Sequence, residues 1–178
     1  MIYFDTSKNA YTFAIENQLC TVTDEEWSEF CTLKLGKDYD VTSDGIVDLR
    51  VTPEYIAEVF NQKKQEKHIE NTQKAKQAVE NGYVTFKNAQ FETNAQTVGD
   101  LTATMLMLQA SGIETYSWLS KDDKVVELTV EDFSTLGGLI AEFKNAVWNE
   151  KYIAFKMAIE NAETLEELNN IEIIYGTI

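Results

Sequence analysis

Three stretches in the second half of the chain show the apolar spacing of amphipathic helices. The first lies between Thr97, which we expect to cap it, and Gly112, where it should end. The longest follows Thr129 and carries two apolar stripes; the second is displaced by one position, so a second face of this helix should also be covered. The last should begin at Thr164, which forms a capping box with Glu167. The two stripes are Phe133, Leu136, Ile140, Phe143 and Val147, and then Trp148, Tyr152, Phe155 and Ile159.

Short alternating runs between turn residues predict strands in both halves of the chain. A helix should open at Thr23, which can form a capping box with Glu26, and should end at Gly36. The pair Asp44-Gly45 marks a tight turn. The expected strands are residues 1–4, 11–22, 46–51, 83–86, 90–93, 115–119 and 125–128.

One further helix is predicted from an opening signal and a stop rather than from an apolar stripe. Pro53, the single proline, stands where the first helical position is expected, and Gly82 should end the helix. Between them, residues 61–70 are polar in every direction, which is typical of a solvent-exposed helix. We therefore expect an α+β protein with a mixed N-terminal module (1–51), an exposed connector helix (52–81) and a C-terminal module of two β-hairpins and three helices (82–178).

Composition narrows the classes of partner. The chain has 178 residues, of which 44% are hydrophobic, so it can bury a core. Its 30 acidic and 15 basic residues give a net charge of -15, which repels phosphate backbones and anionic lipids. We therefore expect no nucleic-acid partner and no membrane partner. Without a visible secretion signal, Cys20 and Cys31 are expected to be reduced thiols in a cytoplasmic compartment.

Residues able to carry chemistry are few and scattered. The single histidine, His68, lies in the polar helix without a predicted catalytic neighbour. Acidic residues near Gly45 depart from a calcium-loop pattern, and two other acidic pairs stand at a turn and at a helix start. We expect no catalytic residues, no metal and no cofactor, and we expect Gly137-Gly138 to permit close helix packing. The acidic residues are Asp38, Asp40, Asp44 and Asp48 near Gly45, Asp122-Asp123 at the turn, and Glu131-Asp132 at the helix start.

The C-terminal residues form an apolar, strand-like tail. Such a tail either pairs with a sheet of its own domain or is offered as a strand to a partner. Under the second hypothesis the partner-binding residues would be Ile171, Ile173, Ile174, Tyr175 and Ile178.

The order and spacing of these elements resemble a known family. Residues 82–171 carry the motifs Phe91-x-Thr93, Leu101, Trp118, Leu128-Thr129-x-x-Asp132 and Ala162-x-Thr164-x-Glu166-Glu167-Leu168-x-x-Ile171. In this order they resemble a domain of unknown function found at the C-terminus of phage tail-fibre and tail-fibre-assembly proteins. Residues 20–50 carry Thr23-x-Glu25-Glu26-Trp27, Gly36 and Asp44-Gly45, and they resemble tail-fibre assembly chaperones more weakly.

The resemblance implies a bacteriophage tail context and protein partners without assigned catalytic residues. The leading hypothesis is a structural or tail-fibre assembly protein, acting as a chaperone or virion component on a tail-fibre or baseplate protein. A second copy of the chain is an alternative partner. Under this hypothesis the expected compartment is the host cytoplasm during assembly, with the virion tail as a later one. An alternative is an acidic phage inhibitor that binds a host nucleic-acid enzyme by mimicking the charge of DNA. A third class, a carbohydrate-active enzyme, would need paired carboxylates across a sugar-binding site.

Overall fold

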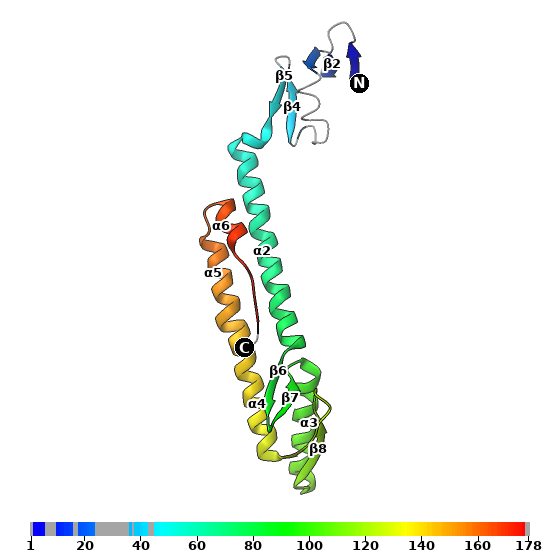
Figure 1. Cartoon of the computed structure of the whole chain (residues 1–178), viewed down its shortest axis with the longest axis vertical. Helices are drawn as coiled ribbons and strands as arrows, with labels where there is room; N and C mark the ends of the chain where they lie inside the picture. The colour runs from blue at the N-terminus through cyan, green and yellow to red at the C-terminus, as the bar shows by residue number, and fades with distance from the viewer. Residues whose placement is uncertain are drawn as a thin grey trace. The chain divides into compact units, whose positions relative to one another are not determined.

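The chain is divided into two compact units. The computed structural model describes residues 2–5, 10–15, 18–23, 36, 38–42 and 45–176. The first unit is Met1–Gln62 and the second is Lys63–Ile178 (Figure 1). The boundary falls within helix α2 (Pro53–Asn81), which begins at the predicted proline and ends just before Gly82. The secondary structure is α+β, as predicted.

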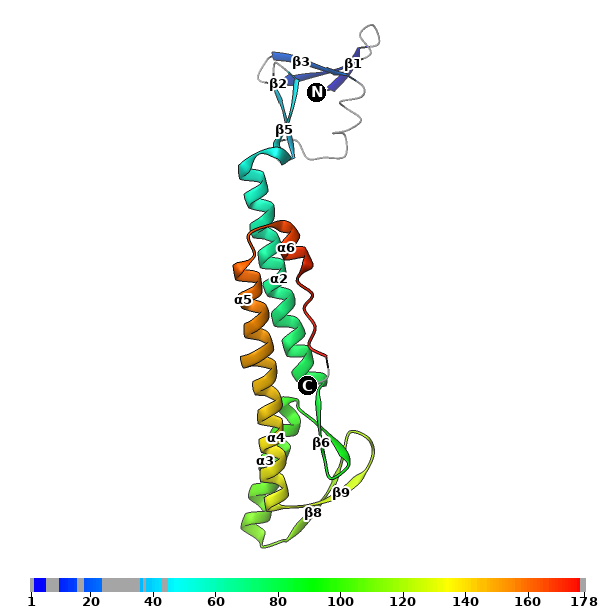
Figure 2. The ribbon, with the colours of Figure 1, turned by 60° about the vertical axis from the view of Figure 1, so that its left-hand side comes forward.

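In the first unit, five described strands pair antiparallel in two sheets (Figure 2). Strands β1 (Ile2–Asp5), β2 (Ala10–Ile15) and β3 (Gln18–Thr23) make one sheet, and β4 (Tyr39–Thr42) pairs with β5 (Gly45–Asp48). The prediction of one strand over 11–22 is wrong, because Ile15 stands opposite Gln18 and the chain reverses between them. The helix predicted from Thr23, and the side chains of Cys20 and Cys31, lie outside the described part.

A short 3₁₀ helix, Leu49–Val51, leads into α2, where a longer strand was predicted. The Asp48 carboxylate accepts a hydrogen bond from the Arg50 backbone N–H at 2.9 Å and caps this helix. It also accepts one from the Arg50 guanidinium at 2.7 Å, and this bond lowers the pKa of Asp48. The strand predicted over 46–51 therefore stops at Asp48.

In the second unit, a tight hairpin follows α2. Strand β6 (Tyr83–Phe86) pairs with β7 (Ala89–Glu92), and Phe86 stands opposite Ala89. Lys87 and Asn88 between them both have positive φ angles, 49° and 62°, as a two-residue turn of type I′ requires. The turn therefore has two residues, one fewer than predicted.

Helix α3 (Ala95–Ser111) comes next and ends at Gly112, as predicted. Gly112 has a left-handed conformation with a φ of 69°. Its cap differs from the prediction. Asn94, and not Thr97, is the capping residue: its side-chain oxygen accepts a hydrogen bond from the Thr97 backbone N–H at 2.8 Å. Thr97 is itself buried in the third helical position.

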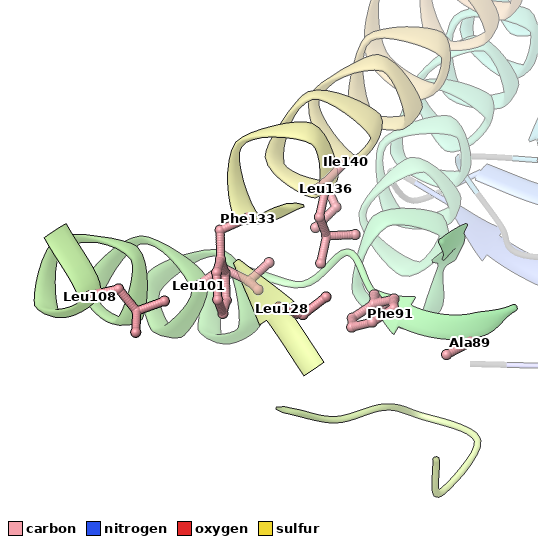
Figure 3. Close-up of a cluster of buried hydrophobic side chains, with 8 residues drawn as sticks. All are labelled: Ala89, Phe91, Leu101, Leu108, Leu128, Phe133, Leu136 and Ile140. Carbon is pink, nitrogen blue, oxygen red and sulfur yellow. The ribbon is translucent and has the colours of Figure 1, made fainter. Parts of the chain in front are cut away.

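A second hairpin and a capped helix complete the core of this unit. Strands β8 (Thr115–Leu119) and β9 (Val125–Thr129) pair antiparallel, and Thr129 caps α4 (Val130–Asn145) in a capping box with Asp132. Side chains from β7, α3, β9 and α4 meet in one buried cluster (Figure 3). Its members are Ala89, Phe91, Leu101, Leu108, Leu128, Phe133, Leu136 and Ile140.

A π-helical segment, Ala146–Tyr152, joins α4 to α5 (Ile153–Asn161). The first apolar stripe of the long helix contributes Phe133, Leu136 and Ile140 to this buried cluster. By contrast, Tyr152 and Phe155 of the second stripe lie near α2 and the C-terminal segment. A π turn holds an extra residue compared with an α turn. The one-residue displacement between the stripes therefore coincides with the π segment, and the predicted second covered face is real. The final helix, α6 (Leu165–Asn170), has the predicted capping box of Thr164 and Glu167.

Two predictions about packing are wrong. The polar helix α2 is not exposed all round, because Asn71 and Ala75 are fully buried. The apolar periodicity of the sequence could not reveal the buried face of α2, because the contacts of that face are largely polar. Gly137 and Gly138 have no atom within 4 Å of the place where a Cβ would stand, so they allow no close packing. The close approach is at Gly82 instead, where a Cβ would stand 2.5 Å from the Ala78 carbonyl oxygen.

Candidate protein-binding surfaces

The C-terminal segment, residues 171–176, lies extended beside α2 (Figures 1 and 2, red). It pairs with no described strand, so the prediction that it joins a sheet of its own domain is wrong. Two lysines of α2 hold it instead. The Lys67 ammonium donates to the Ile171 carbonyl at 2.7 Å, and the Lys74 ammonium donates to the Ile173 carbonyl at 3.0 Å. Side-chain donors from one helix thus replace the neighbouring strand that was expected.

The Glu70 carboxylate orients both lysines. It lies 2.7 Å from the Lys74 ammonium and 3.6 Å from that of Lys67. The hydrogen bond from Lys74, with the charge of Lys67, lowers the pKa of Glu70. A charged carboxylate between two ammonium groups keeps both on the face of α2 that the segment covers.

Asn71 connects three parts of the second unit. Its side-chain amide donates to the Tyr152 carbonyl in the π segment at 3.1 Å, and its carbonyl oxygen accepts from the Tyr175 hydroxyl at 2.5 Å. Asn71 is fully buried, so both bonds form away from solvent. Burial raises the pKa of Tyr175 to about 12, which keeps the hydroxyl protonated as the donor. The Tyr175 ring also lies 5.7 Å from that of Phe155, measured between centroids.

These contacts divide the five residues that were predicted to bind a partner into buried residues and exposed ones. Ile173 and Tyr175 are 2% and 9% exposed, so their side chains serve the chain's own interior. Ile171 is half-buried, and Ile174 is 62% exposed. Ile178 lies outside the described residues. A partner role therefore stays a prediction for the exposed part of the tail, and the buried pair is a structural anchor.

The sequence analysis did not identify the exposed apolar side chains of the second hairpin. Leu119 and Val125 stand opposite each other in the β8–β9 register and are 63% and 70% exposed. An amphipathic pattern predicts which residues can be buried, but it does not show which of them stay uncovered. The other exposed members in this region are Leu106, Met107, Ile113 and Tyr116.

The acidic pairs have structural roles. The Asp122 carboxylate accepts hydrogen bonds from the Gln90 backbone N–H at 2.9 Å and the Ser120 hydroxyl at 2.7 Å, and lies 2.7 Å from the Lys124 ammonium. These bonds, the Gln90 contact first, hold the pKa of Asp122 far below its usual range. Asp123 is in the turn with a φ of 57°. The predicted position of this pair at a hairpin turn is therefore confirmed.

Asp132 and His68 also face charged partners. Asp132 belongs to the capping box of α4 and lies 2.6 Å from the Lys87 ammonium, which lowers the pKa of Asp132. His68 Nε2 lies 3.0 Å from the Glu160 carboxylate, which Lys64 also approaches at 3.3 Å. The hydrogen bond from Lys64 is the main cause of the lowered pKa of Glu160. The histidine thus links α2 to the end of α5.

The acidic residues near Gly45 make internal contacts where they are described. The Asp38 carboxylate accepts from the Tyr55 hydroxyl at 3.1 Å, and this contact adds to desolvation in raising the pKa of Tyr55. Asp48 is engaged by Arg50, and Asp44 lies outside the described residues. Within the described ranges, no three side chains of His, Cys, Asp or Glu are grouped as metal ligands. Nor does any described helix have the length and apolar character needed to cross a membrane.

Residues 62–174 match a protein family described as a domain of unknown function (DUF4376). The match covers well over half of the chain, so the protein belongs to this family. Its first residue is adjacent to Lys63, where the second structural unit begins. The family domain therefore includes most of α2, which the sequence had suggested was a separate connector. No curated protein and no solved structure matches the chain.

Proposed function

We propose that the chain is a non-catalytic, protein-binding component of a bacteriophage tail, acting in tail-fibre assembly or remaining in the finished tail. The resemblance to the C-terminal domains of tail-fibre and tail-fibre-assembly proteins supports the phage context. The observation that carries the binding role is the exposed apolar pair Leu119 and Val125. Large apolar side chains that stand together in water are typical of protein contact surfaces.

The hairpin gives this pair a suitable setting. Because side chains alternate across a strand, Leu119 shares the outward face of β8 with Thr115 and Ser117, while Trp118 turns to the Phe133 ring 5.8 Å away. The Leu119 side chain therefore does not contribute to the core. A growing tail fibre offers apolar, unpaired strand edges before its subunits assemble, and an exposed apolar hairpin can cover them.

A capture experiment tests the proposal. The tagged chain is co-expressed with the tail-fibre and baseplate genes of the phage that encodes it, and bound proteins are identified by mass spectrometry. The test variant is Leu119→Glu with Val125→Glu, and the matched control is Thr115→Glu on the same outward face. We expect the wild type and the control to retain a fibre or baseplate protein, and the double variant to lose it.

Three other outcomes of the capture experiment would contradict the binding surface or the proposed function. Equal capture by the double variant and the control would remove Leu119 and Val125 from the contact. Capture of a host nucleic-acid enzyme that is released at high salt would replace the tail role with charge mimicry. Absence of every tail protein from the wild-type capture would overturn the proposal.

A further inference from the structure

Among the described strands, β6 pairs with β7 alone, and the register shows which of its backbone groups face away from β7. The Thr93 N–H donates to the Gly82 carbonyl at 3.2 Å, so these two residues form a hydrogen-bonded pair. Bonded and non-bonded pairs alternate along an antiparallel ladder. Val84 and Phe86 therefore bond to β7, while the N–H and C=O groups of Tyr83 and Thr85 point away from it.

The hydrogen bonds at the opposite edge of the same hairpin confirm this alternation of bonded and non-bonded pairs. Gln90 stands across from Thr85, so its backbone groups should also point outward, away from β6. They do: the Gln90 N–H donates to the Asp122 carboxylate at 2.9 Å, and its carbonyl accepts from the Lys121 N–H at 2.8 Å. The β7 edge is thus closed at Gln90. Among the described residues, nothing forms a hydrogen bond to the outward groups of Tyr83 and Thr85.

A cleft of about 730 Å³ lies beside this open edge. It is bounded by β6, the end of α2, one face of α4 and the Tyr175–Gly176 end of the described chain. Apolar side chains of Leu139, Phe143 and Val84 line it, and Glu142 lies at the exposed side. Four unpaired backbone groups therefore border an apolar cleft.

We propose that this cleft binds an extended segment of a partner protein, which adds to β6 as a strand. An extended chain is the backbone form that presents N–H and C=O groups at the spacing of Tyr83 and Thr85. Its side chains on the inner face meet Phe143 and Leu139, so they are apolar at alternate positions. The intervening side chains point away from α4 toward solvent, where the net charge of -15 favours lysine or arginine. This inference rests on the proposed protein-binding function and names the chemistry of the partner.

A synthetic peptide tests the edge directly. The probe is an acetylated and amidated hexapeptide of alternating lysine and valine, added to the full chain while amide hydrogen exchange is followed by NMR. In the free chain, the amides of Tyr83 and Thr85 should exchange faster than those of Val84 and Phe86. The peptide should slow exchange at Tyr83 and Thr85 by about tenfold or more.

Two modified peptides distinguish strand addition from attraction of a basic peptide to an acidic protein. One carries N-methyl groups on its valine amides and the other on its lysine amides, so side chains and charge are unchanged. Only every second N–H of an added strand faces β6. One modified peptide should therefore lose binding while the other keeps it. Equal binding of all three peptides would overturn the proposal.

A variant of the protein tests the hydrogen bond between the peptide and the outward N–H of Thr85. Thr85→Pro removes an outward N–H without removing a ladder bond, because proline is tolerated on an open edge. Thr85→Val keeps the N–H and is the matched control. Both variants should unfold near the wild-type temperature, and Thr85→Pro should bind the peptide about tenfold or more weakly than Thr85→Val. Unchanged binding by Thr85→Pro would refute the edge, and if this variant does not fold the methylated peptides decide alone.

Two further outcomes separate this inference from its alternatives. A dimer of the wild type that Thr85→Pro dissociates, without peptide binding, would show that a second copy occupies the edge and would overturn the partner strand. Capture of a tail protein that persists in Thr85→Pro would leave the proposed function standing and remove the β6 cleft as its site.

Discussion

Removal of the Asn71 side chain should separate the C-terminal segment from the helices that hold it. Asn71→Ala leaves the Tyr152 carbonyl and the Tyr175 hydroxyl without their buried partner. A buried polar group that loses its hydrogen bond costs about 1–3 kcal/mol. With two such groups, we expect the free energy of unfolding to fall by about 3 kcal/mol.

A double-mutant cycle makes the same reasoning quantitative. Tyr175→Phe removes the hydroxyl but keeps the ring beside Phe155, so it should cost about 1.5 kcal/mol. In the Asn71→Ala background the hydroxyl has already lost its acceptor, and Tyr175→Phe should then cost about 1 kcal/mol less. The assay is urea unfolding followed by circular dichroism, with unchanged m-values as a check on the comparison.

The exposed residue Gln73 of α2 supplies the control, since Gln73→Ala tests the helix without touching the segment. It should change the free energy of unfolding by less than about 0.5 kcal/mol. Strict additivity of Asn71→Ala and Tyr175→Phe, within about 0.3 kcal/mol, would refute the claim that this hydrogen bond anchors the segment.

Three further predictions follow from the same unit. Because the pKa of Tyr175 is raised to about 12, its contribution to stability should be complete below pH 10 and lost as the pH rises through 12; pH-dependent unfolding of wild type and Tyr175→Phe checks this. Gly137→Ala should stabilise the protein by about 1 kcal/mol, whereas Gly82→Ala should destabilise it by more than about 1 kcal/mol because its Cβ meets the Ala78 carbonyl; thermal unfolding of the two variants should shift in opposite directions. Ile173→Ala should cost about 3 kcal/mol and Ile174→Ala less than about 0.5 kcal/mol in urea unfolding, and equal costs would contradict the burial of Ile173.

Local signals were sufficient to predict most elements of the second unit. Thr129 and Thr164 cap their helices as predicted because a capping box involves residues only three positions apart. Gly112 ends α3 because the left-handed conformation there is a property of one residue. The displacement of the second apolar stripe was also visible in the sequence, because the π segment shifts the helical phase at the position where the first stripe ends and the second begins.

The sequence alone did not reveal the partners of polar residues, because these contacts join positions far apart in the chain. Asn71 lies 104 positions from Tyr175, so a helix that reads as polar on every side can still have a buried face. The tail likewise reads as a strand, yet Lys67 and Lys74 satisfy its carbonyls from a helix. Periodicity reports apolar burial and cannot report such pairs.

The candidate binding surfaces depend on tertiary structure for a related reason. The sequence predicted both hairpins, and with them the strands that carry Leu119, Val125 and the β6 edge. Which apolar residues remain uncovered, and which edge stays open, follows only when neighbouring elements have taken their places: Asp122 and Lys121 close β7 at Gln90, and nothing described closes β6 at Thr85. Local chemistry thus determined the elements, and long-range packing decided which of their faces remained available to a partner.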